Sequence, residues 1–528
     1  MVRRSPMQSN GNRRYRRQPI QEQRGARVAR ERLLPPPVGG WNTRDALGLM
    51  DTKDAVFMRN VFPRQSNVIS RPGFSSHCDT TSSSAVEQLI PYEYAAASKL
   101  FAACGGTIYD VSTATPSTPT GGTGFSNNDW SFDYITGYII MANGVDSVTE
   151  YTGSQFQTSS FTGVTLTDLN HVHVYKSRVY LVEKNSQSMW YGGTGAVAGA
   201  LTEFDFSSVA PVRGNLVLTC HLKGDGGDGG QDDVFVAVFA DGDVLAYTGS
   251  NPSDPTDWAL IGHYKVGRPL SRLSYVQADD DVYLLTDRGY EQLSRMVAMG
   301  DSTARSKIFS DKIQEEVLTQ IDQYGENIDW RIVIHQRGQM LIVTVPAASR
   351  RYHVRNINTG AWCEFLDFNA NCWAVWEGNL YFGESGDGIV HQFNDGSTND
   401  NGTSIRCDVQ QAWTDLGYSS RQKRITLIKP FIFSDYRPVT SVNVGADYNN
   451  ITLAVFDNTS PAIVEALWDQ AVWDSNEWSS SLRNQSKWFS KNAIGSVIGL
   501  RITFDVETTG QRPQWNNTSI VFEVGGYL

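Results

Sequence analysis

Two histidines are the first residues in this chain that could do chemistry. His171 and His173 are two positions apart, so on a β-strand both imidazoles would lie on one face. A zinc site needs a third and a fourth ligand, and the surrounding sequence supplies none at a suitable spacing. We therefore expect a structural role for both rings and no metal site.

An acidic, glycine-rich segment is the second candidate. Residues 223–233 read KGDGGDGGQDD and carry four carboxylates, at Asp225, Asp228, Asp232 and Asp233. Oxygen-rich loops can bind calcium, but this one has neither the spacing of an EF-hand nor its distal glutamate. A mobile acidic loop is the alternative that we favour, and calcium remains the other.

Sequence signatures of catalysis are missing. The chain has no phosphate-binding GK[ST] motif, no GxSxG elbow and no HExxH helix. The turn Gly193–Ala198 follows a hairpin instead of opening a helix, so it is a poor dinucleotide site. Ser253–Trp258 (SDPTDW) only loosely matches the Asp-box of sialidase-type propellers, and it does not repeat. We predict that the protein is not an enzyme and has no cofactor.

The elements that would position any site are hairpins. In Asp281–Leu293 apolar residues alternate on both sides of the turn Asp287-Arg288-Gly289, which predicts an antiparallel pair. Similar hairpins turn at Asn143-Gly144, at Asp241-Gly242 and at Gly386–Gly388, and the spacing along the series is mostly about 35 to 55 residues. Four-stranded blades have this period, so we predict an all-β fold with a β-propeller at 39–400.

The end of the chain predicts a second domain. A turn cluster at Asn399–Gly402 precedes a segment with its own strands, so 401–528 is expected to be a C-terminal β-sandwich-like domain. Trp468, Trp473 and Trp478 recur every five residues there, which fits a turn-rich hairpin or an aromatic shelf that binds sugar. The six cysteines have no CxxC pairing, so we expect free buried thiols.

The beginning of the chain is basic, whereas the rest is acidic. Residues 1–32 hold ten arginines and two glutamates, a net +8, while the whole chain carries −11 and the remainder therefore −19. Few large apolar residues lie in this stretch, so 1–38 is expected to be a disordered or extended arm that ends in the stiff Pro35–Pro37 spacer. It could contact nucleic-acid phosphates, dock onto an acidic partner or remain a solvated tail. Its candidate binding residues are Arg13, Arg14, Arg16, Arg17, Arg24, Arg27 and Arg30.

Membrane insertion is not expected. No window holds the 18 or more consecutive apolar residues of a membrane span, and no apolar region follows the basic N-terminus as in a secretory signal.

Several motifs, in their order along the chain, resemble one family of viral proteins. Three near the start are PVGGWNTRDA (37–46), DAVFMRNVFP (54–63) and SRPGF (70–74). Those in the middle and at the end are YTGSNPSDPTDW (247–258), KVGRPL (265–270), NTGAWCEF (358–365), LYFGESGDG (380–388) and EVGGYL (523–528). Together they resemble the tail nozzle (tail tubular protein B-like) and packaged-DNA stabilisation proteins of short-tailed bacteriophages, over about residues 36 to 528.

The resemblance implies a structural virion protein of the phage tail, made in the host cytoplasm. It would form a homo-hexameric ring that retains DNA and conducts it during ejection. Its partners would be the adaptor or head-to-tail connector, tail fibre proteins and passing double-stranded DNA. Because a like-charged lumen would let DNA slide through, we expect the acidic loop (Asp225, Asp228, Asp232 and Asp233) to face the ring's channel or its mouth. The alternatives are a receptor- or glycan-binding propeller and a head-completion plug.

Overall fold

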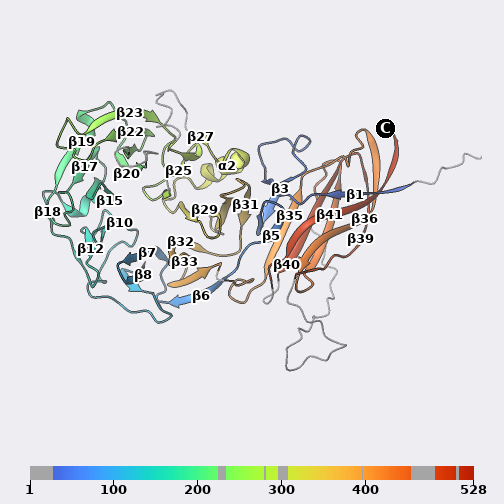
Figure 1. Ribbon diagram of the computed structural model, residues 1–528, viewed down its shortest axis with the longest axis horizontal. Helices are drawn as coiled ribbons and strands as arrows, with labels where there is room; N and C mark the ends of the chain where they lie inside the picture. The colour runs from blue at the N-terminus through green and yellow to red at the C-terminus, as the bar shows by residue number, and fades with distance from the viewer. Residues whose placement is uncertain are drawn as a thin grey trace, which may run out of the picture.

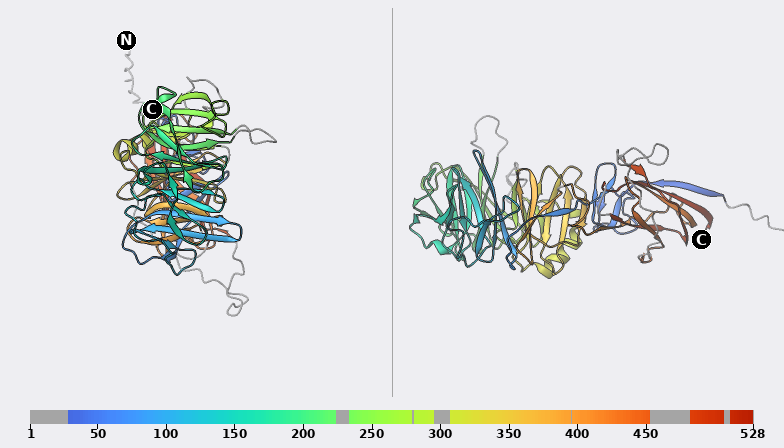
Figure 2. Two further views of the ribbon diagram at one scale, coloured as in Figure 1. Left: turned by 90° about the vertical axis from the view of Figure 1, so that its left-hand side faces the viewer. Right: turned by 90° about the horizontal axis from the view of Figure 1, so that it is seen from below.

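A computed structural model describes residues 28–223, 233–278, 281–294, 307–394, 396–452, 482–506 and 511–527. Strands make up 53% and helices 5%, so the predicted all-β class is confirmed. A ring of blades lies on the left of Figure 1 and a β-sandwich on the right. Figure 2 shows that the two parts form one elongated body.

The ring is a β-propeller, as the sequence predicts. Six blades have four strands each, and the three-stranded sheet β7–β9 completes the ring between two of them. The first three sheets along the chain are β7 (Val86–Tyr94), β8 (Ala97–Cys104) and β9 (Thr107–Asp110); β10 (Ser131–Ile135), β11 (Tyr138–Ala142), β12 (Thr149–Tyr151) and β13 (Phe156–Thr158); and β15 (Leu169–Tyr175), β16 (Arg178–Glu183), β17 (Ser188–Tyr191) and β19 (Thr202–Asp205).

Four more sheets complete the circle, and a strand from before β7 closes it. They are β20 (Leu216–Leu222), β21 (Val234–Phe239), β22 (Asp243–Thr248) and β23 (Ala259–Lys265); β24 (Tyr275–Ala278), β25 (Asp281–Thr286), β26 (Gly289–Gln292) and β27 (Lys307–Ile308); β28 (Arg331–His335), β29 (Met340–Val345), β30 (Arg351–Asn356) and β31 (Trp362–Phe365); and β32 (Ala370–Trp376), β33 (Asn379–Glu384), β34 (Ile389–Phe393) and β6 (Phe74–Asp79). The predicted hairpin at 281–293 is the β25–β26 pair.

Each blade is buried on both faces, which explains the continuous apolar runs of its middle strands. In β21 the side chains of Phe235 and Ala237 belong to the cluster on one face, whereas those of Val236 and Val238 belong to the cluster on the other. Alternate residues of a strand point to opposite faces. A middle strand whose blade packs against a neighbouring blade on each face is therefore apolar at every position.

The sandwich is built from both ends of the chain. One sheet contains β1 (Ala29–Leu34), β4 (Val61–Pro63), β5 (Val68–Ser70), β36 (Arg421–Ser434), β38 (Arg483–Asn484), β39 (Phe489–Gly495) and β41 (Gln514–Tyr527). The other contains β2 (Gly40–Trp41), β3 (Asp54–Arg59), β35 (Ile405–Gln411), β37 (Val439–Ala446) and β40 (Ile498–Val506). In Figure 1 the blue N-terminal strands lie among the orange and red C-terminal ones.

The N-terminal domain boundary predicted from the sequence is therefore wrong. Residues 39–71, assigned to the propeller, pair with C-terminal strands instead: β3 with β35 and β5 with β41. The propeller is an insertion between β5 and β35. Residues 29–34, assigned to the arm, form β1 and pair with β41. The local hairpin pattern could not reveal partners that lie more than 300 residues away along the chain.

The chain passes between the sandwich and the propeller twice, at residues 71–74 and 397–400, and these two crossings lie against each other. The amides of Gly73 and Phe74 donate to the carbonyls of Ser397 (3.0 Å) and Asn399 (3.1 Å). A Cβ at position 73 would stand 2.0 Å from the Asn399 carbonyl oxygen, so this close approach requires glycine. Beside it, the fully buried Arg71 forms a bidentate pair with Asp400, at 2.8 and 2.5 Å.

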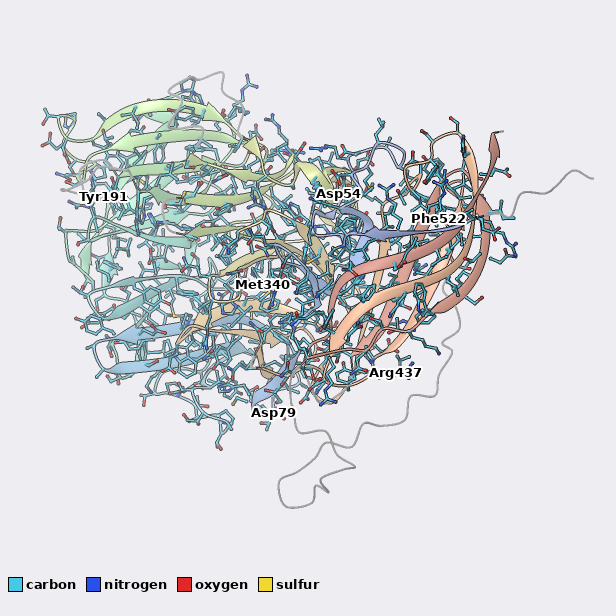
Figure 3. The ribbon with its side chains drawn as sticks, turned by 45° about the vertical axis from the view of Figure 1, so that its right-hand side comes forward. Asp54, Asp79, Tyr191, Met340, Arg437 and Phe522 are labelled. Carbon is cyan, nitrogen blue, oxygen red and sulfur yellow. The ribbon has the colours of Figure 1, made fainter. Side chains whose placement is uncertain are left out.

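Propeller and sandwich also share a sheet and a core. β3 pairs with β31, so the blade β28–β31 continues into the sandwich as one nine-stranded sheet. A single hydrophobic cluster includes Trp330 and Trp362 of the propeller and Trp515 of the sandwich. In Figure 3 Asp54 lies between the two parts, where it accepts from Lys312 (2.6 Å), just before helix α2 (Gln314–Tyr324). A large apolar interface holds domains in a fixed relation.

The cysteines are all free and buried, as the sequence predicts. Among the helices of the described ranges, none has the length and apolar character needed to cross a membrane.

Candidate functional site: the axial cavity of the propeller

A cavity of about 480 Å³ lies where the innermost strands of all seven sheets meet. Each of β7, β10, β15, β20, β24, β28 and β32 contributes at least one lining residue. Inner strands of a propeller run side by side around its axis, and Figure 1 looks down this ring. The volume is that of a small-molecule pocket.

Side chains from four sheets follow one another along the cavity wall: His173, His221 and Gln277 are hydrogen-bonded in a chain, and Asp133 lies beside His173. Asp133 Oδ2 lies 3.4 Å from His173 Nδ1, His173 Nε2 lies 3.1 Å from His221 Nδ1, and His221 Nε2 lies 2.8 Å from Gln277 Nε2. The chain is consistent if the Gln277 amide donates to His221 Nε2 and His221 Nδ1–H donates to His173 Nε2, which leaves the His173 proton on Nδ1, facing Asp133. Burial, with a smaller contribution from the neighbouring His173, lowers the pKa of His221 to about 4.

A charged cluster lies where the same inner strands begin. Asp129 accepts from Arg272 Nη2 at 2.6 Å and from Arg331 Nη2 at 2.7 Å. Both guanidinium groups are largely buried, with 15% and 11% of their side chains exposed. One carboxylate thus ties the segment before β24 to the start of β28.

The two predicted histidines have structural partners, in agreement with the sequence. His171 Nε2 lies 3.1 Å from the hydroxyl of Tyr275, and His173 belongs to the chain described above. Among the described residues no group of three or more His, Cys, Asp or Glu side chains could hold a metal ion.

Sequence reasoning missed Asp133, His221 and Gln277 because they meet only across sheets. The available signal was a polar residue in each of several otherwise apolar inner strands, as in SFDYI, LTCHL and YVQA.

One stem of the acidic loop lines this cavity, and the other lies against Tyr175. Lys223, at the end of β20, lines the cavity, and the backbone carbonyl of Asp233 accepts from the Tyr175 hydroxyl at 2.6 Å. Asp225, Asp228 and Asp232 lie outside the described residues, so their predicted orientation toward the channel of a ring stays a prediction.

One predicted arm residue is described, and it contacts the sandwich. The Arg30 guanidinium stacks on the ring of Tyr418 at 4.8 Å and donates to its hydroxyl, while Arg32 donates to the Leu416 carbonyl at 2.6 Å. Arg30 therefore helps to anchor β1. Two groups of predicted residues lie outside the described ranges: Arg13, Arg14, Arg16, Arg17, Arg24 and Arg27 of the arm, and Trp468, Trp473 and Trp478.

Comparisons with known proteins add little. No family model and no curated protein matches the chain. Among solved structures, the extracellular domain of a hybrid two-component system protein from B. thetaiotaomicron aligns over 61% of this chain and 39% of its own, with 13% identity and a TM-score of 0.41. The WD40 propeller of Doa1 aligns over 61% and 97% (12%, TM-score 0.39), and Saccharomyces cerevisiae Sqt1 over 65% and 96% (10%, TM-score 0.37). Likenesses this distant carry no inference, and the propeller assignment rests on the sheet topology.

Proposed function

We propose that this protein is a structural virion component of a short-tailed bacteriophage, a subunit of a hexameric nozzle ring that retains DNA and then conducts it. The order of the tail-protein motifs supports this role. So does the observation that carries the proposal: one sheet and one hydrophobic core run through both domains. A subunit of this construction is a rigid block, which the wall of a pressurised conduit requires.

The conduit would run between subunits and not through a propeller. The axial cavity has a volume of about 480 Å³, which is the size of a small-molecule pocket. It is too small for a DNA duplex, whose major groove alone is about 12 Å wide. In a ring, the wall would be formed by the outer surfaces of several copies. Apart from its first 32 residues the chain carries −19, and a wall of this sign would let phosphates slide past instead of holding them.

The arm would bind the adaptor ring or a neighbouring subunit. Its root is fixed, since β1 pairs with β41 through Ala29–Leu34 and inserts Leu34 into the core. The N-terminal end of β1 lies at the end of the sandwich that is remote from the propeller (Figure 1). The arm is therefore attached at that end, where another protein could bind it.

Electron microscopy of the purified protein tests the proposal. We expect a six-fold ring whose channel is wide enough for a duplex, with a lumen that is not predominantly Lys and Arg. Deleting residues 1–27 should leave the ring intact and weaken its attachment to the adaptor. A monomer that binds sugars on a glycan array would contradict the ring and favour a receptor-binding propeller. A map of the intact particle separates the nozzle from a head-completion plug.

A further inference from the structure

A second cavity, of about 980 Å³, lies at the junction of the two domains, and we call it the junction cavity. Its walls are the β4–β5 turn and the residue before Pro513 on the sandwich side, and the β28–β29 and β30–β31 turns on the propeller side. Three arginines line it: Arg64, Arg337 and Arg512. Among the described residues no aspartate or glutamate lines this cavity, so its lining carries a formal charge of +3.

The hydrogen-bond partners of these guanidinium groups are neutral. Arg337 Nη1 donates to Asn379 Oδ1 at 3.1 Å, and Arg512 Nε donates to the Ser70 carbonyl at 2.8 Å. Arg64 and Arg337 are exposed, whereas Arg512 is half-buried. Two of the three charges are therefore accessible to a ligand that enters from solvent.

Two of the charges lie close enough to repel each other. Burial lowers the pKa of Arg512 to about 9, and the Arg64 guanidinium contributes to this shift. Arg512 remains protonated at neutral pH, so an anion beside the two groups would relieve their repulsion. Charges removed from water are usually paired with an opposite charge, and the described part of the lining provides none.

Hydrogen bonds hold the walls of the junction cavity in place. The side-chain amide of the buried Asn356 donates to the carbonyl of Pro63, next to Arg64, at 2.9 Å, which ties the propeller to the sandwich. The side-chain oxygen of Asn356 accepts from the backbone amides of Asn358 (2.9 Å) and Thr359 (3.1 Å). The turns that present the arginines are thus fixed before a ligand arrives, and such preorganisation favours binding.

The chemistry of the lining favours phosphate groups. A guanidinium has donors only, in a planar fork that matches two oxygens of a phosphate. Charge-assisted hydrogen bonds of this kind are stronger than neutral ones. A volume of about 980 Å³ lies at the upper end of the range for small-molecule pockets, so more than one phosphate group has room.

We propose that the junction cavity binds an anion with two or more phosphate groups, either a free oligophosphate or the backbone of a nucleic acid. The inference does not rest on the proposed nozzle, since the cavity lies within one chain.

Calorimetric titration of the full-length protein with pyrophosphate, and separately with a short single-stranded oligonucleotide, tests the cavity. Citrate, a polyanion of carboxylates, is the comparison. We expect pyrophosphate to bind at one site per chain, more tightly than citrate, with an affinity that falls as the salt concentration rises. Binding of the oligonucleotide alone would assign the phosphates to a nucleic acid. Binding of neither, or equal binding of citrate, would overturn the proposal.

Two double variants locate the site. Arg64→Gln/Arg337→Gln removes two of the cavity's charges, and each lost guanidinium should weaken binding about tenfold, the value of a hydrogen bond to a charged group. Arg213→Gln/Arg288→Gln removes two exposed charges elsewhere on the propeller, so this matched control should bind as the wild type does. Unchanged affinity in the cavity variant would assign binding to other groups, such as the arginines of the N-terminal arm, and contradict the site. Equal losses in the two variants would do the same for net charge.

A measurement on the unaltered protein covers the case in which a variant fails to fold. A cryo-electron microscopy map at saturating pyrophosphate should show density beside Arg512, and density only elsewhere would sink the inference. The ligand should also raise the Tm of the wild type and of the control, but not that of Arg64→Gln/Arg337→Gln. Ring assembly of this cavity variant should equal that of the wild type, so failure of this proposal and failure of the nozzle are distinguishable.

Discussion

The propeller and the sandwich use the same secondary structure but obtain their partners differently. Blade β20–β23 is formed by consecutive strands within residues 216–265. In the sandwich, by contrast, β41 pairs with β1 and β5 from the beginning of the chain as well as with β36. Contacts between distant residues close long loops and form late. The sandwich therefore depends on the whole chain, whereas most blades depend on their own segment.

The largest expected effect comes from separating the sandwich strands. Residues 401–528 alone lack β1, β3, β4 and β5, so the long strand β41 loses β1 and β5 as partners and β35 loses β3. We expect this fragment to be unfolded, with no dispersed amide signals in NMR spectra and no cooperative urea transition.

A second fragment provides the control for this experiment. Joining residues 28–74 to 397–528 through a glycine-serine linker restores every described sandwich strand and keeps the Arg71–Asp400 pair, and the crossings at Gly73 and Asn399 already lie against each other. This fragment should regain a cooperative transition. A folded 401–528 fragment would show instead that the sandwich is independent of the N-terminal strands.

The next largest effect is expected at the crossings themselves. Arg71→Ala would leave Asp400 buried without its partner, and Arg71 also donates to the Leu366 carbonyl at 3.0 Å. Burial already raises the pKa of Asp400, and the guanidinium opposes that rise. Breaking a buried pair costs about 3–5 kcal/mol, which urea unfolding would measure. The double variant Arg71→Ala/Asp400→Ala should recover part of the loss; strictly additive losses would show that the pair is not coupled.

The sequence predicts the propeller better than the sandwich for a physical reason. The turn Asp287-Arg288-Gly289 and its flanking alternation specify β25–β26 locally, and each such hairpin can be recognised by itself. Nothing local specifies that Ala55 in β3 stands opposite Gln411 in β35. The axial cavity shows the same limit: His173 was recognised from its strand, but His221 and Gln277 become partners only when the blades close into a ring.

Acidification should destabilise the junction through a buried histidine of the propeller. His353 Nδ1 lies 2.8 Å from the Tyr290 hydroxyl, and its ring contacts Trp41 of the sandwich edge-on at 5.6 Å. Burial, with a smaller contribution from Arg351, lowers its pKa from 6.5 to about 3. Between these values the unfolded chain binds a proton that the folded protein does not, so stability falls as the pH falls. From pH 6.5 to 4 the loss should be about 3 kcal/mol.

Two variants isolate this titration. His353→Phe and Tyr290→Phe both remove the same hydrogen bond, but only His353→Phe removes the titrating ring. The pH dependence of the free energy of unfolding should flatten in His353→Phe and persist in Tyr290→Phe. Equal slopes in the two variants would assign the acid sensitivity to other groups.

The smallest effect is expected from an ion pair of the same chemistry on the propeller surface. Arg268 Nε lies 2.9 Å from Asp287 Oδ2, with 69% and 32% of the two side chains exposed. Water already solvates both groups, so pairing them gains little. Asp287 also keeps the backbone amide of Arg268 as a donor, at 2.8 Å, when the side chain is removed. Arg268→Ala should therefore leave the urea midpoint where it is, at low and at high salt, in the buffers used for Arg71→Ala. If Arg268→Ala and Arg71→Ala lowered the free energy of unfolding equally, burial would not explain the difference expected between the two ion pairs. The buried pair at the crossings would then stabilise the protein no more than an exposed pair at a surface turn.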